Sequence, residues 1–195
     1  MVAIIQYNAG NIRSVMNALN RFGVECILTD SPEKIRCADK VIFPGVGEAS
    51  SAMAYLRERQ LDRLIQSLKQ PFLGICLGLQ LMCSHSEEGD TQGLGIFKEK
   101  VKRFPPADKV PHIGWNNFKE IKKTEGNLFN GLNLESDMYF VHSYFAECGS
   151  ETIATTEYIL PFSAALKKEN FYAVQFHPEK SASAGQQLLK NFLSL

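Results

Sequence analysis

The sequence predicts an α/β fold: a single domain with a mainly parallel sheet flanked by helices, and antiparallel strands added in the second half. In the first half, short apolar runs alternate with apolar stripes at helical spacing, which is the pattern of βαβ units. From Gly93 to Ala173, short alternating or aromatic runs are separated by turn signals such as Asn130-Gly131. Between these halves, Pro71 to Cys83 (PFLGICLGLQLMC) predicts a buried strand, a tight turn between two glycines, and a helix.

Each predicted strand of the first half is followed by a helix or a turn. Apolar residues at positions 12, 15, 16, 19 and 22 share one helical face, and Gly23 ends this helix as a left-handed cap. The PGVG run at 44–47 breaks the third strand, and Ser50 or Ser51 caps the next helix. The strands are expected at Val2–Gln6, Val24–Leu28 and Lys40–Phe43, with a turn or cap at Thr29–Ser31 and a further helical stripe at Leu61, Leu64, Ile65 and Leu68.

The second half is expected to lay antiparallel strands and hairpins onto the sheet, and to end in a helix at about Ala182 to Leu193. The sequence contains no linker, low-complexity run or internal repeat, so residues 1–195 are predicted to form one domain. The expected strands of this half are Asn117–Ile121, Met138–Phe145, Thr152–Thr156 and Phe171–Phe176.

The composition limits the classes of function. The 195 residues are 45% hydrophobic with a formal net charge of zero, which indicates neither a nucleic-acid partner nor an anionic membrane surface. No apolar run approaches the roughly 20 residues that span a bilayer. The N-terminus enters a strand without a basic leader. The five cysteines include no CxxC pair, so we expect no metal site, no disulfide framework, no cofactor and a cytoplasmic location.

Cys76 is the candidate nucleophile. It lies between Gly74 and Gly78, where serine stands in a nucleophile elbow, and before a helix predicted from Leu77 to His85. Glycines are expected on both sides because the central residue has a strained backbone and flanking side chains would collide with strand and helix. A buried cysteine in an ordinary βα turn is the alternative, and the pattern alone favours it.

A cysteine nucleophile needs a base, and the base needs an acceptor that orients it. His177 ends an apolar strand, and Glu179 follows two residues later. Residues two apart in an extended segment point the same way, so the imidazole and the carboxylate can meet. An exposed turn with a local ion pair is the alternative. Of the other histidines, one is expected on the nucleophile's helix but too far along it, and two as half-buried strand residues bonded to backbone: His85, His112 and His142.

The chain thus carries a cysteine, a histidine and a glutamate in the order Cys76, His177, Glu179. GICLGLQ, followed much later by QFHPE, resembles the class I glutamine amidotransferases, in which such a triad hydrolyses glutamine. Seven ordered motifs resemble, within that family, the glutaminase subunits of imidazole glycerol phosphate synthase: YNAGNIRSV, FPGVGEASSAM, GICLGLQLM, SEEG, PHIGWN, YFVHSYF and FHPEKS. Together they extend over the chain from end to end.

The resemblance implies a role for each group of residues. The cysteine attacks the side-chain amide of glutamine, the histidine transfers protons and the glutamate orients the histidine ring. Gln80 is one helical turn past the nucleophile and therefore on its face of the helix. For Glu88, Glu87 is a competing candidate and a solvated loop is the alternative. The implied oxyanion donors are Val46, Gly47 and Leu77, and the implied substrate contacts are Gln80, Glu88 and the backbone of Ser143, Tyr144 and Phe145.

The resemblance also implies a partner. This is a (β/α)8-barrel cyclase subunit, bound in a heterodimer, which takes the ammonia and forms imidazole glycerol phosphate and aminoimidazole carboxamide ribotide in histidine biosynthesis. The implied interface positions are Asn11, Trp115, Tyr139 and Lys180. As the only tryptophan, Trp115 is also compatible with a core anchor, although such a residue is often an energetic centre of an interface.

Three alternatives remain for the function. The first keeps the glutaminase chemistry but serves a diverged partner in surface-sugar amidation. The second is another hydrolase on the same elbow, a cysteine peptidase or esterase, against which Gln80 and Glu88 argue because a free amino acid needs its own polar clamps. The third is a docking subunit without catalysis, against which the intact cysteine, histidine and glutamate set argues.

Overall fold

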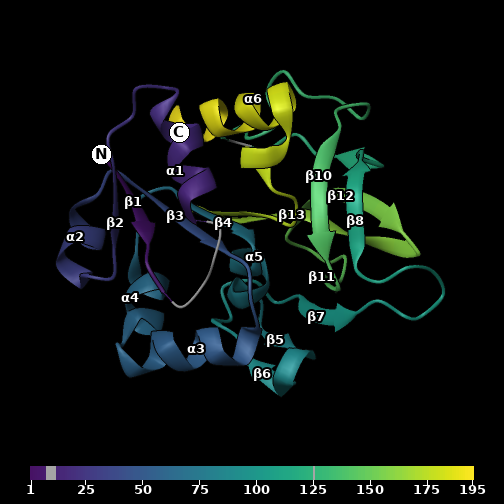
Figure 1. Cartoon of the computed structure of the whole chain (residues 1–195), viewed down its shortest axis with the longest axis horizontal. Helices are drawn as coiled ribbons and strands as arrows, with labels where there is room; N and C mark the ends of the chain where they lie inside the picture. The colour runs from purple at the N-terminus through teal and green to yellow at the C-terminus, as the bar shows by residue number, and fades with distance from the viewer. Residues whose placement is uncertain (8–11, 125) are drawn as a thin grey trace.

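The computed structural model describes residues 1–7, 12–124 and 126–195. Its centre is an eight-stranded sheet in the order β2-β1-β3-β4-β14-β13-β12-β9, parallel from β2 to β14 and antiparallel beyond (Figure 1). The predicted α/β fold, with a mainly parallel sheet and added antiparallel strands, is confirmed. The strands are β1 (Val2–Ile5), β2 (Cys26–Thr29), β3 (Lys40–Gly45), β4 (Phe72–Cys76), β9 (Glu120–Ile121), β12 (Thr152–Tyr158), β13 (Leu160–Lys168) and β14 (Phe171–Val174).

Two smaller sheets accompany the large one. The pair β8–β10 is antiparallel and lies beside the antiparallel half, at the right in Figure 1. The other sheet has the order β11-β7-β5-β6. Their strands are β5 (His85–Ser86), β6 (Thr91–Gln92), β7 (Lys100–Arg103), β8 (His112–Asn116), β10 (Met138–His142) and β11 (Tyr144–Ala146).

Helices cover both faces of the parallel half, with α1 and α6 on one face and α3 and α4 on the other (Figure 1). No helix within the three described ranges has the length and apolar character needed to cross a membrane. The helices are α1 (Ile12–Asn20), α2 (Pro32–Cys37), α3 (Ala49–Glu58), α4 (Leu61–Ser67), α5 (Leu77–Met82) and α6 (Ala182–Leu193), with 3₁₀ turns η1 (Glu88–Asp90) and η2 (Pro178–Lys180).

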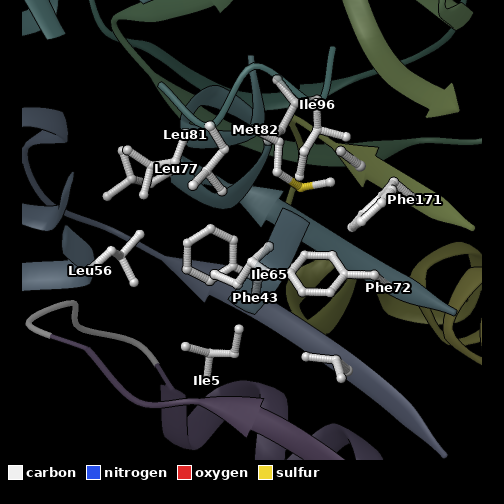
Figure 2. Packing of buried hydrophobic residues seen from close by; sticks show 14 of the residues in the cluster. Ile5, Phe43, Leu56, Ile65, Phe72, Leu77, Leu81, Met82, Ile96 and Phe171 are labelled. Carbon is white, nitrogen blue, oxygen red and sulfur yellow. The ribbon is translucent and has the colours of Figure 1, made fainter. Parts of the chain in front are cut away.

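The inner parallel strands β1, β3, β4 and β14 are buried on both faces, so alternate residues of each strand enter two separate cores. On β1, Val2 and Ile4 pack with α1 and α6, whereas Ala3 and Ile5 pack with α3 and α4. The second of these cores is shown in Figure 2, where the rings of Phe43, Phe72 and Phe171 follow one another across the strands. Neighbouring ring centroids are 5.0, 5.9 and 5.4 Å apart, for Tyr7, Phe43, Phe72 and Phe171 in turn.

Two predictions near the PGVG loop are wrong. The third strand does not break at Pro44, because β3 continues through Gly45 beside β4. Proline is tolerated there since β3 pairs with β1 only as far as Ile42, and no ladder bond on that side needs its N–H. The cap of α3 is Glu48, whose carboxylate accepts hydrogen bonds from the backbone N–H groups of Ser50 and Ser51. The predicted cap at Ser31 opens a helix, α2, that the periodicity did not indicate.

The helix after the elbow is shorter than predicted. It ends at Met82, and His85 lies in β5 instead. The carbonyl groups at its end are satisfied by the returning loop: the N–H of Leu94 donates to Leu81 at 2.7 Å, and the N–H of Ile96 donates to Met82 at 3.0 Å. A helix whose last carbonyls are taken by another segment stops there.

The second half differs from the prediction in several places, and the longest strand there, β13, was not predicted. The run expected as one strand at 138–145 is two strands in different sheets, separated at Ser143. The strand expected at 117–121 begins only at Glu120, and PHIGWN forms β8. The run at 171–176 is not purely antiparallel, since β14 pairs with β13 antiparallel but with β4 parallel. That parallel pair brings the segment after β14 to the elbow. The last helix, α6, has its predicted bounds, Ala182–Leu193.

Candidate functional site

The turn at Cys76 has the geometry of a nucleophile elbow. Cys76 has φ 54° and ψ −106°, a strained conformation for a residue with a side chain. A Cβ on Gly78 would lie 1.9 Å from the carbonyl oxygen of Phe43, and one on Gly74 would lie 2.5 Å from Sδ of Met82. Gly78 is therefore required by the close approach of strand and helix, as the sequence predicts. At Gly74 the contact is with a flexible side chain, and the nearest backbone atom, the carbonyl carbon of Gly78, would lie 3.0 Å away.

The candidate base is held next to this elbow. Val174 pairs with Ile75 in the parallel β14–β4 ladder, so the chain leaving β14 passes directly beside Cys76. Nδ1 of His177 lies 2.8 Å from Oε1 of Glu179, and the two side chains are only 2% and 1% exposed. The structure thus brings together the three residues predicted as a triad, and the alternative of an exposed turn for His177 and Glu179 is wrong.

The charges at this site support an imidazolium. Burial of His177 favours the neutral ring, but the adjacent Cys76 thiolate and the Glu179 carboxylate outweigh it and raise the pKa of His177 to about 10. Because Nδ1 is taken by Glu179, Nε2 is the ring atom left for the sulfur, and it has no hydrogen-bond partner among the described residues. A thiolate beside an imidazolium is the reactive form of a cysteine nucleophile.

A cavity of about 260 Å³ opens onto the sulfur. Most of the predicted oxyanion and substrate residues line it, but Phe145, predicted to contribute through its backbone, is not part of the lining. It is buried 4.6 Å, centroid to centroid, from Phe104 in the core. Sequence reasoning missed Pro111, Val141 and His142. These residues lie at or next to the ends of β8 and β10, which pair only in the folded chain. The lining is Val46, Gly47, Cys76, Leu77, Gln80, Glu88, Pro111, Val141, His142, Ser143 and Tyr144.

The loop at Gly45 to Gly47 lies at one side of the cavity, and a buried tyrosine packs against its first residue. Gly47 has φ 140°, a conformation that favours glycine, and nothing lies within 4 Å of the position of a Cβ there. Below it, the hydroxyl of Tyr7 lies against Gly45, where a Cβ would be 1.8 Å from Oη. Burial raises the pKa of Tyr7, so this hydroxyl stays protonated. Tyr7 was not a predicted site residue.

Two polar side chains converge on the cavity from different elements. Gln80 donates from Nε2 to the carbonyl oxygen of Tyr144 at 2.9 Å and to Oε1 of Gln175 at 3.1 Å. Oε1 of Gln80 is then the atom left for a donor on a substrate. Glu88 accepts from the N–H of Ala49 at 2.9 Å, and burial raises its pKa, which a cation in the cavity would offset. The competing candidate, Glu87, accepts from the N–H of Arg103 and is not part of the lining.

Comparison with known proteins identifies the family. Residues 3–195 match the model of the family described as glutamine amidotransferase class-I. The chain belongs to the class I glutamine amidotransferases. Within residues 1–7, 12–124 and 126–195, no three His, Cys, Asp or Glu side chains lie close enough to hold a metal ion.

Individual relatives of this amidotransferase are similar along their whole length. A protein of Bacteroides fragilis (strain YCH46) described as imidazole glycerol phosphate synthase subunit HisH is 56% identical over 197 residues, covering 100% of this chain and 99% of the relative. One of the same description from Methanothermobacter thermautotrophicus is 42% identical over 200 residues, covering 100% and 98%. A solved structure of a glutamine amidotransferase from Thermotoga maritima superposes with a TM-score of 0.65 at 17% identity, covering 99% of this chain and 82% of the other, which shows a shared fold.

Near the pocket, this amidotransferase buries two histidines in contact. His142 donates from Nδ1 to the carbonyl of Tyr144 at 2.7 Å, and its Nε2 lies 3.1 Å from Nδ1 of His112. Burial lowers the pKa of His112 to about 4 and that of His142 to about 3, so both rings are neutral. The predicted backbone contact is confirmed for His142. His112 instead contacts His142 and, at 3.4 Å, Asn116.

We expect these two histidines to make the amidotransferase less stable in mild acid. Their pKa values in the folded state are below the ordinary value of 6.5, so the unfolded chain takes up protons first as the pH falls. The stabilisation is complete above about pH 6.5 and is lost toward the folded-state values, by up to about 1.4 kcal/mol per pH unit and histidine. His177, whose pKa is raised, is protonated in both states below about pH 6 and does not contribute to the slope there. Between pH 7 and pH 6 it contributes a smaller change of opposite sign, which the wild type and the variant share.

Urea unfolding at about pH 7 and pH 5 measures this difference. The variant His142→Gln should reduce the loss of unfolding free energy between the two values. The matched control is His85→Gln, which removes a histidine one-third exposed at the surface and should keep the wild-type slope. A His142→Gln slope equal to that of the wild type would contradict the assignment.

The positions predicted to meet a partner form a surface cluster. Trp115 is 55% exposed, so the alternative of a core anchor is wrong. Its ring lies 5.7 Å from that of Tyr139 in an edge-to-face arrangement, and Nζ of Lys180 lies 5.8 Å from the Tyr139 ring. Ile113, on the same strand as Trp115, is 61% exposed. The predicted position Asn11 lies outside the described residues.

Proposed function

We propose that this chain is the glutaminase subunit of imidazole glycerol phosphate synthase. It hydrolyses glutamine to glutamate and passes ammonia to a (β/α)8-barrel cyclase subunit, which forms imidazole glycerol phosphate and aminoimidazole carboxamide ribotide in histidine biosynthesis. The observation that carries the proposal is the arrangement of Cys76, His177 and Glu179 beside a small cavity that Gln80 and Glu88 line, in a chain 56% identical to a protein described as that subunit. The five free thiols support a cytoplasmic location, and residues 1–195 act as one amidotransferase domain.

The chemistry begins with the thiolate. Cys76 attacks the side-chain carbonyl carbon of glutamine, and the electron pair of the C=O bond moves to oxygen. His177 donates the proton on Nε2 to the amide nitrogen, the C–N bond breaks, and ammonia leaves a γ-glutamyl thioester. Glu179 keeps the proton on Nδ1 throughout and so fixes which nitrogen reacts.

The second half of the reaction uses the same groups in reverse. The now neutral Nε2 of His177 takes a proton from water, and the hydroxide formed attacks the thioester carbon. Collapse of this second oxyanion breaks the C–S bond, returns the thiolate and releases glutamate. The sum is glutamine plus water giving glutamate plus ammonia.

Each oxyanion needs N–H donors at the mouth of the cavity. We assign these to Leu77, directly after the nucleophile, and to the loop at Val46 and Gly47, both of which line the cavity. Glu88 would bind the α-ammonium group of glutamine. The pocket backbone at Ser143 and Tyr144 would hold the rest of the substrate, and this assignment no longer includes Phe145.

A partner is proposed because free ammonia would be protonated and lost in water. The exposed cluster Trp115, Tyr139 and Lys180 would meet the cyclase. A connection to the base supports this choice: the backbone N–H of His177 donates to the carbonyl of Tyr139 at 2.8 Å. Contact at this surface would therefore act on the strand end that carries the base.

The proposal is tested by measuring glutamate release from the purified chain, first by itself and then mixed with the barrel subunit plus its ligand. We expect low activity from the chain by itself and a rise of about 10- to 100-fold in the mixture, the range of ordinary coupling between sites. Trp115→Ala should reduce this rise and leave the basal rate unchanged. The control is Leu28→Ala, which truncates an exposed residue on the edge strand β2. Full activity without any partner would contradict the coupled mechanism.

A further inference from the structure

Gln175 is a fully buried polar side chain for which the mechanism above has no use. It follows the last residue of β14, Val174, which pairs with Ile75, so it lies alongside Cys76. Its Nε2 is 3.7 Å from Sγ of Cys76, within the longer range of hydrogen bonds to sulfur. A carboxamide at zero exposure beside a reactive sulfur is costly to bury unless it is bonded there.

The orientation of this carboxamide follows from its neighbours. The carbonyl oxygen of Tyr144 only accepts, so the atom of Gln80 that lies 2.9 Å from it is the nitrogen. That nitrogen also lies 3.1 Å from the side chain of Gln175, which must present its oxygen there. The nitrogen of Gln175 therefore faces the sulfur. The chain of bonds runs from Tyr144 through Gln80 and Gln175 to Cys76.

A backbone carbonyl near the sulfur explains why a donor is needed there. The carbonyl oxygen of Val141 lies 3.9 Å from Sγ, where it can accept from the thiol but repels the thiolate. An N–H directed at the sulfur offsets that repulsion when the proton leaves. A neutral amide does so without opposing the positive charge on His177, which a lysine at the same place would do.

We propose that Gln175 stabilises the Cys76 thiolate by donating a hydrogen bond from Nε2, and that Gln80 sets the orientation of this donor. Gln175 and His177 both follow β14 and both direct a donor at the sulfur. The donor of Gln175 is a neutral amide, and that of His177 is a charged imidazolium. The proposal deepens the proposed function, because the thiolate it concerns is the glutaminase nucleophile. Gln80 accordingly has two tasks, one toward the substrate and one toward the nucleophile.

The test measures the pH profile of Cys76 alkylation by iodoacetamide in the absence of glutamine. Peptide mass spectrometry separates the five cysteines, and the exposed Cys37 is the internal reference. Gln175→Met keeps the length of the side chain and removes the donor. We expect the midpoint for Cys76 to move up by about 1–2 pH units, the effect of one hydrogen bond to a charged group, while Cys37 is unchanged.

The matched control is Gln70→Met. This is the same substitution at a half-buried glutamine that donates to the carbonyl of Ile35, at the other end of β4 from Cys76. It should leave the Cys76 midpoint unchanged. A second variant, Gln175→Glu, still accepts from Gln80 but directs a carboxylate at the sulfur, so its midpoint should lie above that of Gln175→Met. An unchanged midpoint in a folded variant at position 175 overturns the proposal.

NMR titration of the wild-type chain tests the proposal even if both variants at position 175 fail to fold. The side-chain amide resonances of Gln175 should shift with pH at the same midpoint as Cys76 alkylation, and this titration should vanish in Cys76→Ser. Resonances that do not follow the alkylation midpoint also overturn the proposal. None of these readouts uses glutamine or a partner, so they stand apart from the glutaminase assay.

Discussion

Replacing Cys76 by alanine is expected to abolish glutamine-dependent synthesis by the complex, while added ammonia still supports the partner's reaction. The physical reason is that no other cysteine among the described residues lines the cavity, and loss of a nucleophile costs about 10⁴-fold or more in kcat. The protein should remain folded, because the side chain lost is small. The measurement is the rate of product formation by the mixed subunits with glutamine and with ammonium salt.

The control for this variant is Cys83→Ala. Cys83 is a buried thiol seven positions further on, which bonds to the carbonyl of Leu79 rather than to a base. Burial raises its pKa well above the ordinary range, so it is an inert thiol. It should keep glutamine-dependent activity. If Cys76→Ala lowered product formation equally with glutamine and with ammonium salt, the defect would lie outside the glutaminase step, and this would contradict the proposed role.

The second large effect is expected for Gly78→Ala. Alanine is the better helix former by about 1 kcal/mol, so propensity alone predicts a gain. The added Cβ, however, would lie 1.9 Å from the carbonyl oxygen of Phe43, a backbone atom of β3 that cannot turn away. Either α5 or β3 must move, and we expect the free energy of unfolding to fall by about 3 kcal/mol. Because α5 begins directly after Cys76, kcat/KM should also fall by about 100-fold, the cost of a displacement near 1 Å.

Urea unfolding and glutaminase kinetics measure these two effects, with Gly23→Ala as the control. Gly23 has φ 68°, and nothing lies within 4 Å of the position of a Cβ there. That substitution should cost only the strain of the left-handed backbone, about 1 kcal/mol, and leave kinetics unchanged. If Gly78→Ala were no less stable than Gly23→Ala, the close helix–strand contact would not be the reason for this glycine.

The candidate site was predictable where its residues form local patterns. The glycines beside Cys76 and the spacing of His177 and Glu179 are visible in a few consecutive letters, and the fold brings all three residues together. Gln175 was missed although it carries a signal, since it is a polar residue at the end of an apolar strand just before the histidine. Phe145 was included by resemblance for its backbone, and it lies outside the cavity lining, with its side chain in the core.

Other features had no local signal. His112 and His142 meet because β8 and β10 pair in a register that sets them opposite each other, thirty residues apart in the chain. Nothing in either segment specifies that register. The cap at Glu48 was missed for a related reason: a serine is the more frequent cap, and only the folded turn shows that a carboxylate reaches both N–H groups.

The sequence by itself determined the α/β class, the elbow at Cys76 and the last helix, because hydrophobic periodicity and glycine spacing act over one turn or one strand. Only the tertiary structure decided that β14 lies parallel to β4, and hence that His177 and Gln175 flank the sulfur. Strand order depends on which of many apolar surfaces are buried against each other. Strand order is therefore set by packing throughout the core, and no single segment of the sequence specifies it.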